Sequence, residues 1–309
     1  NSFLASFCLP HSLSVPMTTT LYTFTVLIWG SSWIMFELQE GVVPAEVSGA
    51  YRFGISAVLM FLLAGVSGAP RRFSGREHGF LAFQGILMFA LNIFFLYLAA
   101  QYIPSGLNAV VFSMASIISM GTGAIIHQRL PSLTPFIGAL IGVAGVTVIF
   151  WPEIKSLDLT GGAGLGLLLS LAGTTSFAVS VRVGERNQKV GLGGLGGLAW
   201  AMTYGTMLLC VIAIVRSSSF AFDYRFAYVG SLVFLIVVNS VAGFSIYFAL
   251  INRIGADQAA YVTILFPLVA LMISTIFENY QWTIPAFIGV ALTLIGNVLV
   301  LRNRPAKAS

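Results

Sequence analysis

The chain has 309 residues, of which 58% are hydrophobic and only 8% are charged, and its net charge is +5. Soluble domains carry about 25% charged residues, so this composition leaves too little polar surface for a water-soluble domain. The basic residues lie in loops and form no patch, which excludes a nucleic-acid partner. Two cysteines, Cys8 and Cys210, are too few for a disulfide framework or a cysteine metal site. We therefore expect an integral membrane protein.

Apolar runs of helix length follow one another along the chain, separated by short polar or charged segments. A helix needs about 20 apolar residues to cross the hydrocarbon core of a bilayer. The runs predict ten transmembrane helices, at residues 19–37, 45–66, 79–100, 104–126, 133–151, 162–182, 192–215, 227–250, 256–277 and 283–301. Outside them, we expect residues 1–18 to form an N-terminal extension, residues 152–161 a linker and residues 302–309 a basic cytoplasmic tail.

The Lys and Arg residues are distributed unevenly between the two sides of these predicted spans. With the N-terminus in the cytoplasm, eleven of the 15 fall in cytoplasmic segments and three, Lys155, Arg216 and Arg225, fall in outer loops. Loops rich in positive charge typically stay on the cytoplasmic side. The pattern predicts a multi-pass protein with both termini in the cytoplasm, and the outer loop at 216–226, with its two arginines, is the main exception.

An internal repeat relates the two halves of the chain. Residues 103–149 align without a gap with residues 254–300, at a constant offset of 151. The clearest matches are Phe136-Ile137-Gly138 with Phe287-Ile288-Gly289, and Gly145 with Gly296. The offset makes the repeat unit five helices, and an odd number of spans inverts the second copy in the membrane. The predicted fold class is therefore all-α, with ten transmembrane helices arranged as two inverted five-helix repeats, residues 19–151 and 162–301.

Polar side chains inside the predicted spans are the candidates for a substrate site, because polar groups in lipid are costly unless they are paired or face a cavity. Asparagine, serine and tyrosine could bind the charged ends of a zwitterion, and aromatic rings could line a pocket for its side chain. The candidates are Trp29, Asn92, Tyr97, Asn108, Ser113, Asn239, Ser240, Tyr247 and Tyr261. Two alternatives stay open: the asparagines could bridge helices, and the aromatic residues could serve as packing or interfacial anchors.

Ionisable residues within the spans are few. Glu37, near the outer end of the first span, is the best candidate for a titratable coupling group. Arg52, in the second span, could either pair with Glu37 or extend its head group to the interface. No Asp or Glu lies at the middle of a predicted span, which argues against tight proton coupling and leaves facilitated efflux open.

Other functions find little support in the sequence. The glycine spacing of residues 191–196 matches the pattern of a dinucleotide-binding motif. Such a motif binds a nucleotide only when it follows a strand in a βαβ unit, so we expect a hinge or a tight helix entry there instead. The chain has no Walker A motif, and its three histidines are dispersed, which disfavours ATP-driven pumping, metal binding and enzyme activity. A channel would need a continuous polar lining, whereas the polar residues cluster at mid-depth. We expect no cofactor; the expected partners are a small-molecule substrate and membrane lipids, and the pattern is compatible with a monomer.

Several residues resemble one transporter family. These are Trp29-Gly30-Ser31-Ser32-Trp33 in the first span, then Ala249-Leu250, Pro267 and Glu278, and finally Phe287-Ile288-Gly289 with Gly296. In order and spacing they resemble the EamA-type branch of the drug/metabolite transporter superfamily, and within it the YddG-type amino-acid exporters. The resemblance implies a carrier in a bacterial inner membrane that exports small neutral or zwitterionic metabolites, amino acids including aromatic ones, by alternating access. Sugars, nucleosides and cationic drugs are the alternative substrates.

Overall fold

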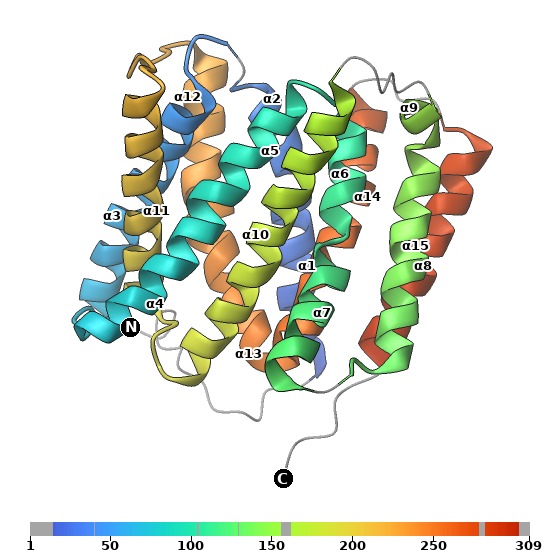
Figure 1. Ribbon diagram of the computed structural model, residues 1–309, viewed down its shortest axis with the longest axis horizontal. Helices are drawn as coiled ribbons and strands as arrows, with labels where there is room; N and C mark the ends of the chain where they lie inside the picture. The colour runs from blue at the N-terminus through green and yellow to red at the C-terminus, as the bar shows by residue number, and fades with distance from the viewer. Residues whose placement is uncertain are drawn as a thin grey trace.

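The computed structural model describes residues 15–39, 41–103, 105–128, 130–155, 162–277 and 282–302, and every regular element in this part of the chain is helical (Figure 1). The first half contains α1 (Val15–Gly30), α2 (Ser32–Glu37), α3 (Ala45–Ser67), α4 (Gly75–Gly85), η2 (Ile86–Leu91), α5 (Asn92–Ala100), α6 (Ser105–Ser113), α7 (Ala115–His127), α8 (Leu133–Ile149) and α9 (Trp151–Lys155). The second half contains α10 (Ala163–Lys189), α11 (Leu195–Val215), α12 (Phe226–Phe234), η4 (Leu235–Gly243), α13 (Phe244–Ala260), α14 (Val262–Phe277) and α15 (Ile284–Arg302).

Some sequence-based expectations fall outside the described part of the chain. These are most of the N-terminal extension (residues 1–14), the second part of the linker (156–161), Glu278 and the tail at 303–309. The helical backbone of Trp33 and Glu37 is described, but their side chains are not. The short helix α9 occupies the first part of the expected linker.

The helices pack side by side in one bundle (Figure 1). Seven helical stretches are long and apolar enough to cross a membrane: Ala45–Ser67, Gly75–Ala100, Leu107–Ile126, Ala163–Lys189, Leu195–Val215, Phe226–Ala260 and Ile284–Leu301. Two shorter apolar helices, Leu133–Ile149 and Val262–Ile273, accompany them. The chain is therefore a multi-pass integral membrane protein, as its composition predicts.

Several helix ends differ from the predicted ones for local reasons. α4 begins at Gly75 because Ser74 and Glu77 form a capping box, in which the Ser74 N–H donates to Glu77 Oε2 at 2.6 Å. α10 continues to Lys189, beyond the predicted end at residue 182. α13 runs through the predicted loop before residue 256, but it is interrupted at Gly255, where φ is +79°. Glycine adopts this backbone conformation at little cost.

Two of the long helical stretches contain π-helical segments, which the hydrophobic pattern did not predict. η2 lies between α4 and α5, and η4 lies between α12 and α13. A π-helix pairs each residue with the one five positions away, and such segments are often found at functional sites. The segment η4 carries two of the predicted substrate-site residues, Asn239 and Ser240.

Glycines allow α8 and α15 to pack closely side by side (Figure 1). A Cβ atom on Gly138 would lie 2.8 Å from the carbonyl oxygen of Gly296, and one on Gly145 would lie 2.6 Å from the carbonyl oxygen of Gly289. The Tyr261 hydroxyl donates to the Gly138 carbonyl oxygen at 3.0 Å. Small residues let membrane helices approach this closely, so the contact leaves no room for larger side chains at these positions.

Candidate functional site

A buried arginine in α3 is the first feature of the candidate site. Arg52 is 4% exposed. Its Nε donates to the Ser240 hydroxyl at 2.9 Å, and its Nη2 donates to the Asn239 side-chain oxygen. The guanidinium also lies over the rings of Phe53, at 4.7 Å, and Phe36, at 5.3 Å. Of the two alternatives for Arg52, the one in which the head group reaches the interface is therefore wrong, because polar groups of η4 and two aromatic rings hold it inside the bundle.

An aromatic cluster surrounds Trp29 of α1, which is 6% exposed. Its ring centroid lies 4.6 Å from that of Tyr247 and 4.8 Å from that of Phe244. Phe266 and Phe177 complete the cluster at 5.7 Å and 6.2 Å. These rings come from α1, α10, α13 and α14, so residues far apart in the sequence form one apolar wall.

Asn239 connects the arginine to this cluster. The Trp29 indole Nε1 donates to the Asn239 carbonyl oxygen at 3.2 Å, while the side chain of the same residue binds Arg52. At the end of η4 the backbone pairing changes from the π to the α pattern, and the Phe244 N–H bonds the Ser240 carbonyl. Asn239 itself lies within the π segment. The π segment therefore supplies the acceptor that Trp29 uses.

Tyr247 carries a polar group with no partner in the described structure. The residue is 0% exposed, and its hydroxyl makes no hydrogen bond. Its ring packs against Trp29 and stacks on Phe177 at 6.4 Å. A buried hydroxyl without a partner costs about 1–3 kcal/mol. A polar group of a bound ligand would remove this cost.

The remaining predicted residues lie around this cluster or away from it. Tyr97 is half-buried, and its ring contacts Phe36 at 5.7 Å, beside Arg52. The other four make these bonds: Asn92 donates to the Gly173 carbonyl at 3.0 Å, Asn108 donates to the Leu96 carbonyl at 3.2 Å, Ser113 donates to the Val110 carbonyl at 2.6 Å and Tyr261 donates to the Gly138 carbonyl at 3.0 Å. The structure thus brings Trp29, Asn239, Ser240 and Tyr247 together, and the side-chain donors of the other four bind backbone carbonyls of the protein itself.

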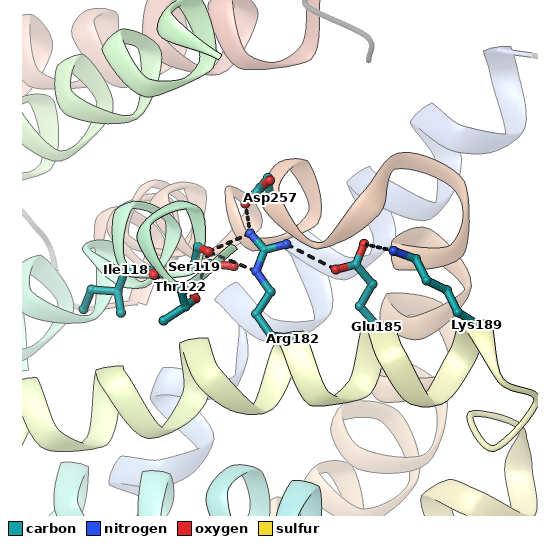
Figure 2. A network of polar contacts seen from close by, with 7 residues as sticks. All are labelled: Ile118, Ser119, Thr122, Arg182, Glu185, Lys189 and Asp257. Atoms are coloured by element: carbon teal, nitrogen blue, oxygen red, sulfur yellow. Dashed lines mark hydrogen bonds and ion pairs between the residues drawn. The ribbon is translucent and has the colours of Figure 1, made fainter. Parts of the chain in front are cut away.

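A second buried arginine ties three helices together near the lower end of the bundle in Figure 1, where α10 ends. In Figure 2, Arg182 of α10 donates to the Ser119 carbonyl of α7, with distances of 3.0 Å from Nε and 2.6 Å from Nη2. It pairs with Glu185 at 3.2 Å and with Asp257 of α13. Lys189 also pairs with Glu185 at 3.2 Å. We refer to these five residues as the Arg182 network.

The Arg182 network corrects one sequence-based placement. Arg182 was expected at the start of a cytoplasmic loop, but it is 7% exposed because α10 continues for two more turns and directs its side chain towards α7. Gly123 makes room for it, since a Cβ atom there would lie 2.7 Å from the guanidinium carbon. The sequence offered one signal of this role, a glycine on the helix that faces the arginine.

The two arginines of the loop at 216–226 are neutralised locally. Arg216 pairs with Glu46 at 3.1 Å, and Arg225 pairs with Asp223 at 2.7 Å. Hydrogen bonds from the backbone N–H and the side chain of Arg225 hold the pKa of the Asp223 carboxyl below its usual range. The two arginines that depart from the predicted charge distribution are therefore both paired with carboxylates.

The glycine-rich stretch at 191–196 does not form a nucleotide site. It follows the helix α10 and leads into α11, so the strand that the dinucleotide motif requires is not there. Gly191 has a φ of +80°, and a Cβ atom on Gly196 would collide with the Pro70 carbonyl oxygen. These glycines serve a tight turn and a close contact. Within the described residues, no group of three His, Cys, Asp or Glu side chains could hold a metal ion.

Comparison with known proteins gives the family. The model of the EamA-like transporter family matches residues 18–151 and 164–302. The chain belongs to this family. EamA-like proteins are membrane transporters of the drug/metabolite transporter superfamily and not, in general, enzymes, so the resemblance of the sequence motifs is confirmed at the level of the family.

Similar proteins match most of the length of this EamA-like transporter. "Uncharacterized transporter YvbV" of Bacillus subtilis (strain 168) is 25% identical over 302 residues, which cover 94% of this chain and 93% of that protein. "Protein PagO" of Salmonella typhimurium is 21% identical over 299 residues, which cover 92% and 95%. One solved structure, described as "Crystal structure of protein", aligns with a TM-score of 0.77 and 16% identity over 93% of this chain and 96% of that one. The similarity to this solved structure shows a shared fold.

Proposed function

We propose that this EamA-like transporter is a carrier that exports small neutral or zwitterionic metabolites, above all amino acids including aromatic ones, by alternating access. The observation that carries the proposal is the buried cluster of Trp29, Asn239, Ser240 and Tyr247, in which aromatic rings lie beside polar groups. Such a combination suits a ligand with an apolar side chain and a polar head.

The proposal includes ten spans in two halves, residues 19–151 and 162–301, and matched elements in the two halves support it. The family model matches one stretch in each half. Shifted by the offset of 151, α8 falls on residues 284–300, within α15, and η2 falls on residues 237–242, within η4. Corresponding helices therefore have similar limits, and the same helix of each half contains a π segment.

The contact between α8 and α15 supports an inverted arrangement of the halves. By the same offset, Gly138 corresponds to Gly289 and Gly145 corresponds to Gly296. Gly138 packs against Gly296, and Gly145 packs against Gly289, so exchanging the halves exchanges the two contacts. This reciprocity is a property of a two-fold axis. The order of the contacts makes the helices antiparallel, so the axis crosses them in the plane of the membrane.

The Arg182 network supports a state in which one end of the bundle is closed. It ties α7 of the first half to α10 and α13 of the second half. We place this end in the cytoplasm of a bacterial cell, together with both termini, because the segments on this side carry most of the Lys and Arg residues. A metabolite leaving the cytoplasm has to enter here, so the network must open and close in each export cycle.

The test is transport by the purified protein in vesicles. We expect saturable uptake of labelled amino acids and acceleration of that uptake by unlabelled amino acid on the opposite side. Linear, non-saturating flux would indicate a pore, and uptake confined to sugars, nucleosides or cationic drugs would contradict the substrate class. Repeating the uptake with a pH gradient, with wild type and Glu37→Gln, tests whether Glu37 couples transport to protons.

A matched pair of tryptophan variants connects the transport to the cluster. Trp29→Phe removes the indole N–H that binds the Asn239 carbonyl, and we expect weaker transport. Trp151→Phe changes a residue that is 52% exposed in α9, and we expect transport like wild type. Equal transport by both variants would contradict the placement of the site.

A further inference from the structure

We infer that Arg52 binds the carboxylate of the exported metabolite, so that this carrier selects substrates that bear a carboxylate group. The inference deepens the proposed function and rests on it. It gives one named residue the task of recognising the head group, while the rings around Trp29 and Tyr247 contact the apolar part.

The charge of Arg52 is the first argument. A guanidinium inside a membrane span is costly unless a partner compensates its charge. Among the described residues, its hydrogen-bond partners are the neutral side chains of Asn239 and Ser240, and the groups stacked on it are the neutral rings of Phe36 and Phe53. These contacts orient the guanidinium but do not neutralise it. An anionic group of a ligand would do so.

The geometry of the guanidinium is the second argument. Arginine has five N–H donors in a planar fork, which matches a carboxylate with two parallel hydrogen bonds. The bonds to Ser240 and Asn239 use Nε and Nη2. Nη1 makes no bond to the described residues, and Nη2 has a second hydrogen. The head group therefore retains donors for an incoming acceptor.

The comparison with Arg182 is the third argument, because the same chain contains a buried arginine whose charge is compensated. Arg182 pairs with Glu185 and Asp257 and also bonds the Ser119 carbonyl. Both arginines lie inside the bundle, at 4% and 7% exposure. Only Arg182 has carboxylate partners among the described residues, which is the arrangement expected if it is structural and Arg52 receives a ligand.

The position of Arg52 relative to the aromatic cluster is the fourth argument. Phe53, under the guanidinium, contacts Phe89 at 5.0 Å, and Phe89 contacts Phe244 at 4.8 Å. Phe244 packs on Trp29, and so does the ring of Tyr247, whose hydroxyl has no partner among the described residues. Cation, apolar rings and a free hydroxyl thus belong to one continuous cluster. An amino acid presents the same elements: a carboxylate, an apolar side chain and an amino group.

The test compares ligands that differ only in the head group. Purified wild type is titrated with phenylalanine, with its amide, which lacks the carboxylate, and with 3-phenylpropionate, which lacks the amine, and thermal stabilisation reports binding. Because charged hydrogen bonds are strong, we expect the two carboxylates to bind at least about tenfold more tightly than the amide. In Arg52→Gln this preference should fall to about twofold or less, and Arg52→Lys should retain part of it.

A control and a competing carboxylate complete the design. Arg225→Gln removes an arginine whose side chain is 58% exposed and paired with Asp223 in a loop, and the preference should persist. Glu37→Gln tests whether Glu37 competes for Arg52: unchanged or tighter carboxylate binding supports the inference, and loss of the preference overturns it. Arg52→Gln must also show the cooperative melting of a folded protein. If it does not, the carboxylate preference is compared between wild type and Arg52→Lys.

The outcomes separate this inference from the proposed function. If phenylalanine is transported but the amide binds equally well, or if Arg52→Gln retains the preference, the role of Arg52 is wrong and the amino-acid carrier stands. If 3-phenylpropionate binds through Arg52 while no amino acid is transported, the amino-acid substrate is wrong and the carboxylate site stands. If none of the carboxylates binds wild type, the role of Arg52 is wrong whatever else is transported.

Discussion

Gly138 of α8 lies so close to Gly296 of α15 that a Cβ atom on Gly138 would be 2.8 Å from the Gly296 carbonyl oxygen. Because the repeat relates Gly138 to Gly289 and Gly296 to Gly145, the second contact of the pair, between Gly145 and Gly289, has the same form. The repeat therefore relates the residues of one close contact between α8 and α15 to those of the other.

Replacing Gly138 by alanine should therefore destabilise the protein. The added methyl group has to displace the backbone of α15, and overpacking of this kind costs about 1–3 kcal/mol. The melting temperature of the purified protein measures the effect. Gly121→Ala is the control, since no atom lies within 4 Å of its Cβ position, and it should be neutral or slightly stabilising. Equal melting temperatures of the two variants would show that α15 moves away from Gly138 at little cost.

Breaking the Arg182 network should favour opening of the end of the bundle where α10 terminates. Asp257→Asn removes one of the two carboxylates that bind Arg182, so the buried cation loses part of its compensation. In a background without Cys8 and Cys210, a cysteine at Ser119, which is 0% exposed, should react several times faster with a water-soluble maleimide than it does in the parent.

Lys189→Gln is the control for the Asp257 experiment. Within the network, Lys189 pairs with Glu185 and not with Arg182, and its side chain is 63% exposed, so its removal should leave labelling at residue 119 near the parent rate. Exposed ion pairs contribute about 0–1 kcal/mol. If both variants accelerate labelling equally, the opening does not depend specifically on the contact between Asp257 and Arg182.

Tyr247→Phe should separate stability from transport. The Tyr247 hydroxyl is buried without a partner, so its removal should leave the ligand-free protein as stable as wild type or more stable, by about 1–3 kcal/mol. If the hydroxyl binds a substrate, the same variant should raise the KM for uptake. The melting temperature without ligand and the KM are measured on the same preparation. An unchanged KM would remove the hydroxyl from the site.

Asn92→Ala should show the opposite behaviour. The Asn92 side chain donates to the Gly173 carbonyl and connects α5 to α10, so its loss removes a buried hydrogen bond between two helices. A lower melting temperature with an unchanged KM for uptake is expected. A raised KM with wild-type stability would return Asn92 to the substrate site, as the sequence suggested.

The properties that depend on local hydrophobicity could be predicted from the amino-acid sequence alone. Apolar runs of helix length make a multi-pass helical protein, and the offset that matches Phe136-Ile137-Gly138 with Phe287-Ile288-Gly289 also matches α8 with α15. Hydrophobicity and helix period are properties of neighbouring residues, so they can be read without knowing what each helix contacts.

The directions of the polar side chains, in contrast, depend on how the helices pack. Arg52 turns inward because Asn239 and Ser240, 187 and 188 residues away in the sequence, accept its hydrogen bonds, and Arg182 is buried because Ser119 and Asp257 come from other helices. Nothing local distinguishes an arginine that reaches the interface from one that finds partners inside. The free energy of burying a charge depends on groups that the fold brings together, and it therefore becomes defined only when the helices pack.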